Sequence, residues 1–244
     1  IINLAAQAGV RNSIDNPKAY LDNNITGFFN ILEVSKENNI NHLIFASTSS
    51  VYGNNKNFPL SEDDNSDHPL SFYAATKKAN EVMAHSYSNI YKLPCTGLRF
   101  FTVYGPYGRP DMSLFKFTQA IYKSKYISLF NKGDHIRDFT YVDDIISGIM
   151  KVINNPPKKS IPFDIYNIGS GNPKSLKFYL NTIKNIIKKK PKIKLYQLQK
   201  GDIRKTHADI SKIQKAFNYQ PKYNLQVGIK NFIEWYNSYF SNKK

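Results

Sequence analysis

The chain has 244 residues, of which 41% are hydrophobic, and carries a formal net charge of +16. This length suits one large or two small domains with a substantial core. No apolar run reaches the length of a membrane span, which excludes a membrane-embedded class. A single cysteine, Cys95, excludes an intramolecular disulfide and favours the reducing cytoplasm. The five histidines show no metal-ligand spacing, so we expect no metal site.

The excess positive charge lies in the last part of the chain. Residues 1–150 contain 14 Lys and Arg against 14 Asp and Glu, whereas residues 151–244 contain 20 against 4. A nucleic-acid or anionic-membrane surface and a solvated lysine-rich face both fit this excess. We favour the solvated face, because most of these residues are Lys and no nucleic-acid-binding motif occurs. We therefore expect neither nucleic acid nor membrane as a partner.

The predicted elements alternate between strands and helices along the chain. IINLAAQ predicts a buried strand, residues 17–38 a helix that begins with Pro17, and HLIFA a strand that ends in four consecutive hydroxyl residues. After a polar, acidic loop, whose Glu62, Asp63 and Asp64 we expect to be solvated, a helix begins near residue 73. We then predict the strand TGLRFF, a helix at 112–125, the strand ISLF, the segment RDFTYV, a helix at 143–153, the strand FDIYNI, a lysine-rich helix, the strand KIKLYQL and a final helix.

Tyr73 and Lys77 are the first candidates for chemistry. Four residues apart on a helix, they lie on one face about 6 Å apart, with Ser71 as a candidate N-cap. An ammonium so close favours the ionised phenol, so we expect it to lower the pKa of Tyr73 from its usual value near 10 and make it a base. The same spacing would also occur if Tyr73 were simply packed against the protein and Lys77 were solvated, with no catalytic role for either. The hydroxyls at a strand end 25 residues upstream favour a site, because ligands of open α/β sheets bind there.

The order Ser47-Thr48, then Tyr73-x-x-x-Lys77, resembles the extended short-chain dehydrogenase/reductase superfamily and, within it, the nucleotide-sugar 4-epimerases. Longer segments resemble the UDP-glucuronate 4-epimerases over essentially the whole chain: LAAQAGVR, SEDD, YAATKKANE, LRFFTVYGPYGRPDM and RDFTYVDDI. The resemblance implies an α/β fold, with a Rossmann-type parallel sheet and a smaller α/β substrate-binding domain. It implies that residues 1–104 are the remainder of an NAD-binding domain, and that residues 105–244 are mainly the substrate domain, with a return to the sheet near 140–170.

The glycine-rich turn that cradles a dinucleotide pyrophosphate does not occur in this sequence. Gly169-Ser170-Gly171 comes late and is typical of an ordinary turn. By resemblance the chain begins inside the fourth strand of the family's sheet, and about 80 residues of βα units would precede it. We therefore expect an N-terminally truncated fragment, which without this turn can be inactive.

The resemblance also implies the ligands and their residues. The cofactor is NAD, and the substrate is a UDP-sugar; relatives form homodimers through the Tyr73 helix and the helix before it. The implied cofactor-binding residues are Leu4, Ala5, Ala6, Gln7, Asn23, Ser47, Tyr73, Lys77 and Phe101. The implied substrate-binding residues are Arg11, Thr48, Ser49, Ser50, Thr102, Arg109 and Arg137. The competing interpretations are a packed strand end at residues 4–7, a buried polar cap at Asn23 and surface ion pairs at the arginines.

The reaction implied is inversion at carbon 4 of a UDP-uronic acid through a transient 4-keto sugar, with Tyr73, Lys77 and Thr48 as catalytic residues. Related dehydratases carry acids after the catalytic Thr, where this chain has Ser49 and Ser50. A UDP-glucose/galactose 4-epimerase is the nearer alternative, but Thr102 stands where those enzymes usually have Asn. A non-catalytic binding protein would be expected to have lost Tyr73, Lys77 or the hydroxyl at 48.

Overall fold

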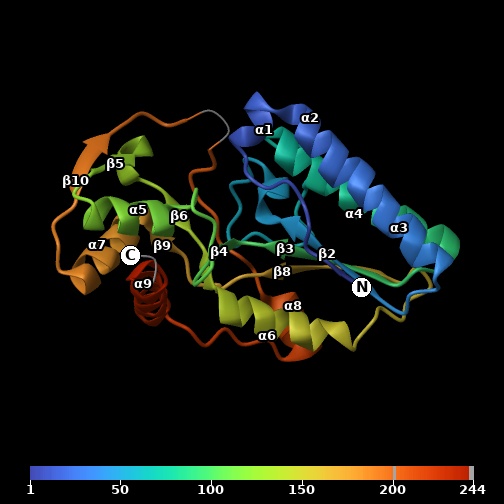
Figure 1. Ribbon diagram of the computed structural model, residues 1–244. Coiled ribbons are helices and arrows are strands. Elements are labelled where there is room, and N and C mark those ends of the chain that lie inside the picture. Colours follow the sequence, from blue (N-terminus) through green and yellow to red (C-terminus); the bar gives the residue numbers. More distant parts are fainter. Residues whose placement is uncertain (200–201, 242–244) are drawn as a thin grey trace.

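A four-stranded parallel sheet forms the centre of one lobe of the molecule (Figure 1). The structure is a computed structural model, and it describes residues 1–199 and 202–241. The strands lie in the order β1-β2-β3-β8, with all neighbours parallel. Their bounds are Ile2–Asn3 for β1, Leu43–Thr48 for β2, Cys95–Phe100 for β3 and Phe163–Ile168 for β8.

The inner strands are buried over nearly their whole length. All six residues of β2 are buried, as are the first five of β3. Strands covered on both faces by helices read as continuous apolar runs, which is how HLIFA and TGLRFF appear in the sequence. The prediction of a buried strand at IINLAAQ was wrong. β1 comprises two residues at the edge of the sheet, and Ile1, Ile2 and Leu4 are more than two-fifths exposed.

Helices cover both faces of the sheet. On one face lie α3 (Gly27–Glu37) and α4 (Phe72–Tyr91), which pack around the buried Phe28, Leu32 and Phe45. On the other lie α6 (Val142–Ile153) and α8 (Ser211–Phe217), which pack around Ile44 and Ile168 (Figure 1). The predicted helix 17–38 consists of α2 (Pro17–Tyr20), a π-helical turn (Leu21–Thr26) and α3, and α1 (Asn12–Asp15) precedes it.

A second lobe lies beyond the carboxyl ends of the strands (Figure 1). Its core is aromatic and aliphatic, and includes Tyr104, Phe139, Tyr179 and Phe232. Its elements are β4 (Thr102–Tyr104), α5 (Ser113–Tyr122), β5 (Tyr126–Leu129), β6 (Ile136–Arg137), β7 (Phe139–Tyr141), β9 (Lys174–Ser175), α7 (Leu176–Ile187), β10 (Lys192–Leu195) and α9 (Leu225–Ser241). The pairs are β4 with β7 and β5 with β10, both parallel, and β6 with β9, antiparallel.

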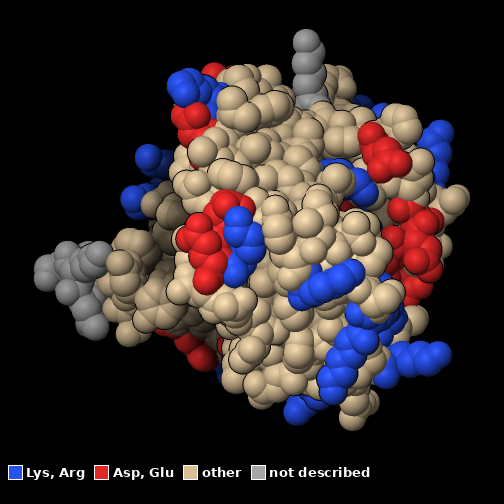
Figure 2. All heavy atoms as spheres, turned by 90° about the vertical axis from the view of Figure 1, so that its right-hand side faces the viewer, with Lys and Arg blue, Asp and Glu red and all other residues tan. Residues whose placement is uncertain are grey.

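The chain passes between the lobes more than once. It enters the second lobe at β4, returns through α6 and β8, leaves again at β9, and comes back to the sheet lobe at α8. On the face in Figure 2, clusters of Asp and Glu lie among the Lys and Arg side chains. No helix in the described part of the chain is long and apolar enough to cross a membrane.

Candidate active site

The carboxyl ends of β1, β2 and β3 meet at the edge of the sheet that faces the second lobe. Because the strands are parallel, the segments that follow them, at 4–11, 49–52 and 101–102, lie at this one edge. The amino end of α4 joins them. Its first turn is capped as predicted, since the Ser71 side chain accepts a hydrogen bond of 3.2 Å from the Ala74 N–H.

Thr48 and Tyr73 meet at this edge. Thr48, the last residue of β2, is buried, and its Oγ1 accepts a bond of 3.2 Å from the Ser50 N–H. A hydrogen bond between the Thr48 and Tyr73 side chains joins the strand end to the helix start. The sequence prediction that these hydroxyls come together is thus met in the structure.

The electrostatic prediction for Tyr73 was wrong for the chain in this state. Burial raises the pKa of Tyr73 above its usual value, while the Thr48 hydrogen bond and the charge of Arg109 act in the opposite direction. Lys77 does not contribute to this pKa shift. Desolvation therefore outweighs the stabilisation of the phenolate, a balance that helix spacing alone does not reveal.

Lys77 is a buried cation. Its side chain is 5% exposed, and burial lowers its pKa from 10.5 to about 8. Within residues 1–199 and 202–241, no hydrogen-bond or ion-pair partner holds its ammonium. Buried charges are usually paired, so a cation without a partner at a strand-end edge indicates a place where a polar ligand binds.

Asn24, rather than Asn23, ties the segment after β1 to α4. Gln7 N donates to Asn24 Oδ1 at 2.8 Å, and Asn24 Nδ2 donates to Gln7 O and to Thr76 Oγ1, both at 3.0 Å. Asn23 is exposed, and its amide donates to the Ala19 carbonyl one turn back. The π-helical turn adds a residue to this stretch of helix, which moves the inward-facing position by one.

Tyr20 and Arg109 approach the same segment from two sides. The buried Tyr20 hydroxyl donates to the carbonyls of Ala8 and Gly9, at 2.9 and 2.7 Å, and its ring packs edge-on against Tyr73 at 6.1 Å. Gly9 has a φ of +113°, and a Cβ there would lie 3.2 Å from Arg109 Nη2. Tyr20 was not among the predicted site residues, because a tyrosine inside a helical pattern carries no signal of its partners.

Residues after β3 form the side of the site toward the second lobe. Thr102 and Arg109 line the same small cavity, of about 30 Å³, together with Gly105 and Met112. Arg109 also pairs with Asp111 at the surface. Among the other predicted residues, Ser49 after β2 is buried and Ser50 is half-buried. After β1, Leu4 and Ala5 are exposed and Ala6 is half-buried. Phe101 packs in the core beside Tyr52.

Arg11 and Arg137 gather around one carboxylate at the junction of the lobes. Arg11 Nη2 lies 3.2 Å from Asp202 Oδ2 and its guanidinium sits over the Phe130 ring at 4.9 Å. Arg137 donates to the carbonyls of Ile136, Ile203 and Arg204, and burial lowers its pKa to about 10.

His135 completes this cluster. It is 5% exposed, lies 3.9 Å from Asp202, and neither ring nitrogen has a hydrogen-bond partner within the described ranges. Burial lowers its pKa. His135 was not among the predicted residues, because a lone histidine between a turn and a strand is an ordinary pattern.

Two residues named in the sequence analysis have their partners elsewhere in the protein. The Ser47 hydroxyl donates to Glu81 at 2.6 Å, inside the protein, so its side chain is not directed toward Tyr73. Glu62 is not solvated as expected: it is half-buried, its Oε1 accepts from the Asn167 N–H at 2.6 Å, and burial raises its pKa.

Comparison with known proteins adds independent evidence. The model of the NAD dependent epimerase/dehydratase family matches residues 1–169. Protein CapI of Staphylococcus aureus is 48% identical over 98% of this chain and 76% of its own length, and a probable UDP-glucuronate 4-epimerase of Rhizobium meliloti is 41% identical over 97% and 74%.

A crystal structure of UDP-glucuronic acid 4-epimerase from Bacillus cereus, in complex with UDP-glucuronic acid and NAD, superimposes with a TM-score of 0.91 at 33% identity. The match covers 97% of this chain and 74% of that one. The family model spans well over half of the chain, and relatives of this identity agree with it. The chain is therefore a member of the NAD dependent epimerase/dehydratase family.

Proposed function

We propose that this protein catalyses the NAD-dependent 4-epimerisation of a UDP-uronic acid, interconverting UDP-glucuronate and UDP-galacturonate. The observation that carries the proposal is the meeting of Thr48 and Tyr73 at the carboxyl edge of a parallel sheet, with the buried Lys77 ammonium one turn further along α4. Relatives named as UDP-glucuronate 4-epimerases, and a similar structure that holds UDP-glucuronic acid and NAD, supply the substrate and cofactor.

In this proposal Tyr73 is the base that takes the proton of the sugar 4-hydroxyl. The Thr48 hydroxyl orients the phenol, and the hydrogen bond between them already favours its ionised form. The Arg109 charge acts in the same direction. Because burial opposes ionisation, Tyr73 becomes a base only when further positive charge lies beside it.

The residues present fit NAD at this edge. The buried Lys77 ammonium lacks an acceptor among the described residues, and ribose hydroxyls would supply one. The exposed Leu4 and Ala5 and the half-buried Ala6 and Gln7 form a surface of mostly small side chains beside it, held by Asn24. NAD, when bound, supplies the hydride acceptor and donor and a positive charge near Tyr73.

Ser49, Ser50 and Thr102 support a sugar that carries a carboxylate. Ser49 and Ser50 directly follow Thr48, and Thr102 begins β4, two residues after the end of the neighbouring strand β3, so their hydroxyls can serve as neutral donors. No acid stands directly after Thr48 to protonate a departing hydroxyl, which favours epimerisation over dehydration.

Arg109 and the Arg11–Arg137 cluster are proposed to hold the nucleotide diphosphate. Guanidinium groups bind phosphate oxygens with two parallel hydrogen bonds. The hydrogen bonds that Arg137 donates go to backbone carbonyls, and its lowered pKa reports a buried cation that an anion would stabilise. Arg11 reaches this cluster from the sheet lobe, so a bound diphosphate would join the two lobes.

The proposal is tested with protein expressed from its whole reading frame, supplied with NAD and UDP-glucuronate. We expect UDP-galacturonate to accumulate, resolved by chromatography or by the proton NMR of the sugar. Parallel assays contain UDP-glucose and UDP-N-acetylglucosamine. Conversion of UDP-glucose without conversion of UDP-glucuronate would replace the proposed substrate with a neutral hexose.

The role of the base is tested with Tyr73→Phe. We expect kcat to fall by about 10²–10⁴-fold, the usual contribution of a general base, with KM nearly unchanged. Tyr91→Phe, on the same helix and half exposed, is the matched control and keeps full activity. A Tyr73→Phe enzyme with near-normal kcat would assign the base elsewhere.

We also propose a homodimer that pairs through α3 and α4, and a reaction that takes place in the cytoplasm. The two helices lie side by side in Figure 1 and carry large apolar side chains toward solvent. Phe29 and Val34 of α3 are 43% and 49% exposed, and Val82 of α4 is 60% exposed. Cys95 is buried and free, in keeping with a reducing compartment.

A further inference from the structure

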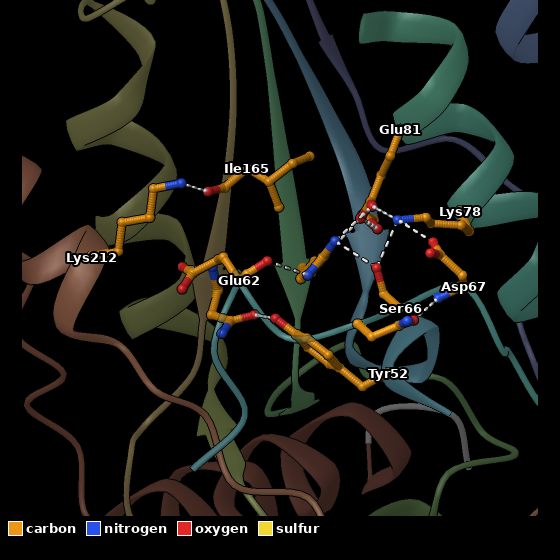
Figure 3. Close-up of polar contacts among 12 residues, drawn as sticks. Tyr52, Glu62, Ser66, Asp67, Lys78, Glu81, Ile165 and Lys212 are labelled. Carbon is orange, nitrogen blue, oxygen red and sulfur yellow. Dashed lines mark hydrogen bonds and ion pairs between the residues drawn. The ribbon is translucent and has the colours of Figure 1, made fainter. Parts of the chain in front are cut away.

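A buried polar network lies behind the catalytic edge, and Glu81 is at its centre (Figure 3). Glu81 follows Lys77 by four residues and Tyr73 by eight on α4, so the three side chains leave the same face of the helix. Its side chain is buried, at 4% exposed. A carboxylate in such surroundings needs strong partners.

Those partners come from the two central strands. Glu81 Oε1 accepts from Ser47 Oγ at 2.6 Å and from Arg99 Nε at 2.9 Å, while Oε2 accepts from Arg99 Nη2 at 2.8 Å. Ser47 on β2 and Arg99 on β3 are register partners in the sheet. Ser47 immediately precedes Thr48, so the carboxylate is tied to the peptide that carries the Thr48 hydroxyl.

The network also holds the segment on the other side of Thr48. The Arg99 guanidinium sits 4.8 Å over the ring of Tyr52, the last residue of the 3₁₀ turn that contains Ser49 and Ser50. The Tyr52 hydroxyl donates to Asn167 Oδ1 on β8 at 2.6 Å. In Figure 3 Tyr52 and Glu81 are shown in one group of polar contacts that includes Ser66 and Lys78.

Burial of an ion pair is a poor way to gain stability, because desolvation opposes the Coulomb attraction and apolar residues of the same volume often do as well. The directional contacts matter more here. Two hydrogen bonds from Arg99 fix the carboxylate in a plane, and the third fixes Ser47 against it. They connect α4, which carries Tyr73 and Lys77, to the strand that carries Thr48.

We propose that Ser47 and Glu81 are positioning residues that set the distance between the Thr48 and Tyr73 hydroxyls. The inference rests on the proposed function, since it assigns a role to groups that act through Thr48 and Tyr73. It also gives Ser47 a different role from the cofactor contact that the family resemblance implied. The competing explanation is a structural ion pair with no effect on the chemistry.

Ser47→Ala is the variant of choice, because it removes one contact and leaves the Glu81–Arg99 pair intact. Its control is Ser88→Ala, which removes another fully buried hydroxyl, at 0% exposed, from the far end of α4, where it donates to the Leu93 carbonyl at 2.8 Å. We expect Ser47→Ala to lower kcat by about tenfold with KM within twofold of wild type, since small misplacements of reacting groups are costly. Ser88→Ala should keep kcat. Equal kcat in both variants and wild type would overturn the proposal.

A double-mutant cycle separates positioning from a general structural effect. If Ser47 acts through Thr48, then Ser47→Ala causes no further loss of kcat in a Thr48→Val background. Effects that multiply would show that the Ser47 hydroxyl acts independently of Thr48, and would overturn the inference.

Failure of the proposed function is distinguishable from failure of this inference. The cycle is measured with whichever UDP-sugar the wild-type protein converts, so that a neutral substrate would overturn the uronate proposal alone. If wild type converts none, crystal structures of wild type and Ser47→Ala report the Thr48 Oγ1 to Tyr73 Oη distance directly. We expect this distance to increase in the variant; an unchanged distance would overturn the inference.

Discussion

The side chains of Tyr73 and Lys77 show how far residue spacing predicts chemistry. The four-residue interval places both on one face of α4, as expected. Their protonation depends on burial, which spacing does not encode. Burial acts on both groups against the charged form: it raises the pKa of the Tyr73 phenol, which therefore resists losing its proton, and lowers the pKa of Lys77, whose amine therefore holds its proton less tightly.

Lys77 should reduce the stability of the ligand-free protein at neutral pH. Its pKa is about 8 in the folded chain against an ordinary 10.5, so between these values the unfolded chain binds a proton that the folded chain lacks. The free energy of unfolding therefore rises with pH across this window, and the full penalty is present below pH 8. The difference corresponds to about 3 kcal/mol.

Lys77→Met is accordingly expected to raise the free energy of unfolding at pH 7 by up to about 3 kcal/mol, a gain that shrinks toward pH 10.5, while it abolishes turnover. Urea denaturation at pH 7 and at pH 10 measures the gain in the free energy of unfolding and its decrease with pH. Lys116→Met, an exposed lysine on α5, is the control and should show no such pH dependence. A Lys77→Met protein less stable than wild type at pH 7 would contradict the argument.

At the scale of single elements, the amino end of α4 was predicted in detail. Ser71 caps the helix, and the first turns carry Tyr73 and Lys77. Loss of a serine cap leaves an N–H without a partner, at a cost of about 1 kcal/mol.

We therefore expect Ser71→Ala to lower the free energy of unfolding by about 1 kcal/mol, whereas Ser71→Asp retains most of it. Ser175→Ala provides the comparison, because Ser175 caps α7 in the same way, accepting from the Phe178 N–H at 3.1 Å. Both alanine variants should lose similar stability in urea denaturation. Only Ser71→Ala should also lower kcat, because Ser71 caps the helix that carries Tyr73 and Lys77.

The helix at 17–38 shows where element-level prediction fails. Its extent agrees with the structure, but the π-helical turn at Leu21–Thr26 shifts the inward-facing amide from Asn23 to Asn24. Both candidates are asparagines, so residue type does not distinguish them. Asn23 was assigned through the family resemblance, which does not show which of two adjacent asparagines faces inward.

At the scale of the whole molecule, the chain crosses repeatedly between the lobes, and the site forms where they meet. Arg11 follows β1, whereas its partner Asp202 is 191 residues away in sequence. A ligand that bridges Arg11 and Arg137 would fix the relative position of the two lobes. Lysines dominate the charge of residues 151–244 but contribute little to the surroundings of Arg137. The cluster around Arg137 is built from Arg, His and Asp side chains.

Assembly is the prediction that belongs to this scale. If a second copy covers α3 and α4, Val82→Glu places a charge in a buried apolar interface, and the protein should change from dimer to monomer in sedimentation analysis. Met150→Glu is the matched control, since Met150 is also 60% exposed but lies on α6. A dimer lost in Met150→Glu and kept in Val82→Glu would assign the interface to α6.

The sequence by itself determined the order of elements, the buried central strands, the Ser71 cap and the alignment of Tyr73 with Lys77, because local periodicity and turn chemistry dictate them. It also carried the family resemblance, since the matching motifs extend along the whole chain.

Only the tertiary structure decided which polar groups meet. Asn24 rather than Asn23 faces Gln7, Ser47 turns inward to Glu81, and Asp202 pairs with Arg11. The edge position of β1 leaves its apolar side chains exposed, and burial reverses the expected pKa shift of Tyr73. The reason is physical: desolvation and long-range pairing depend on segments far apart in sequence, which no local pattern records.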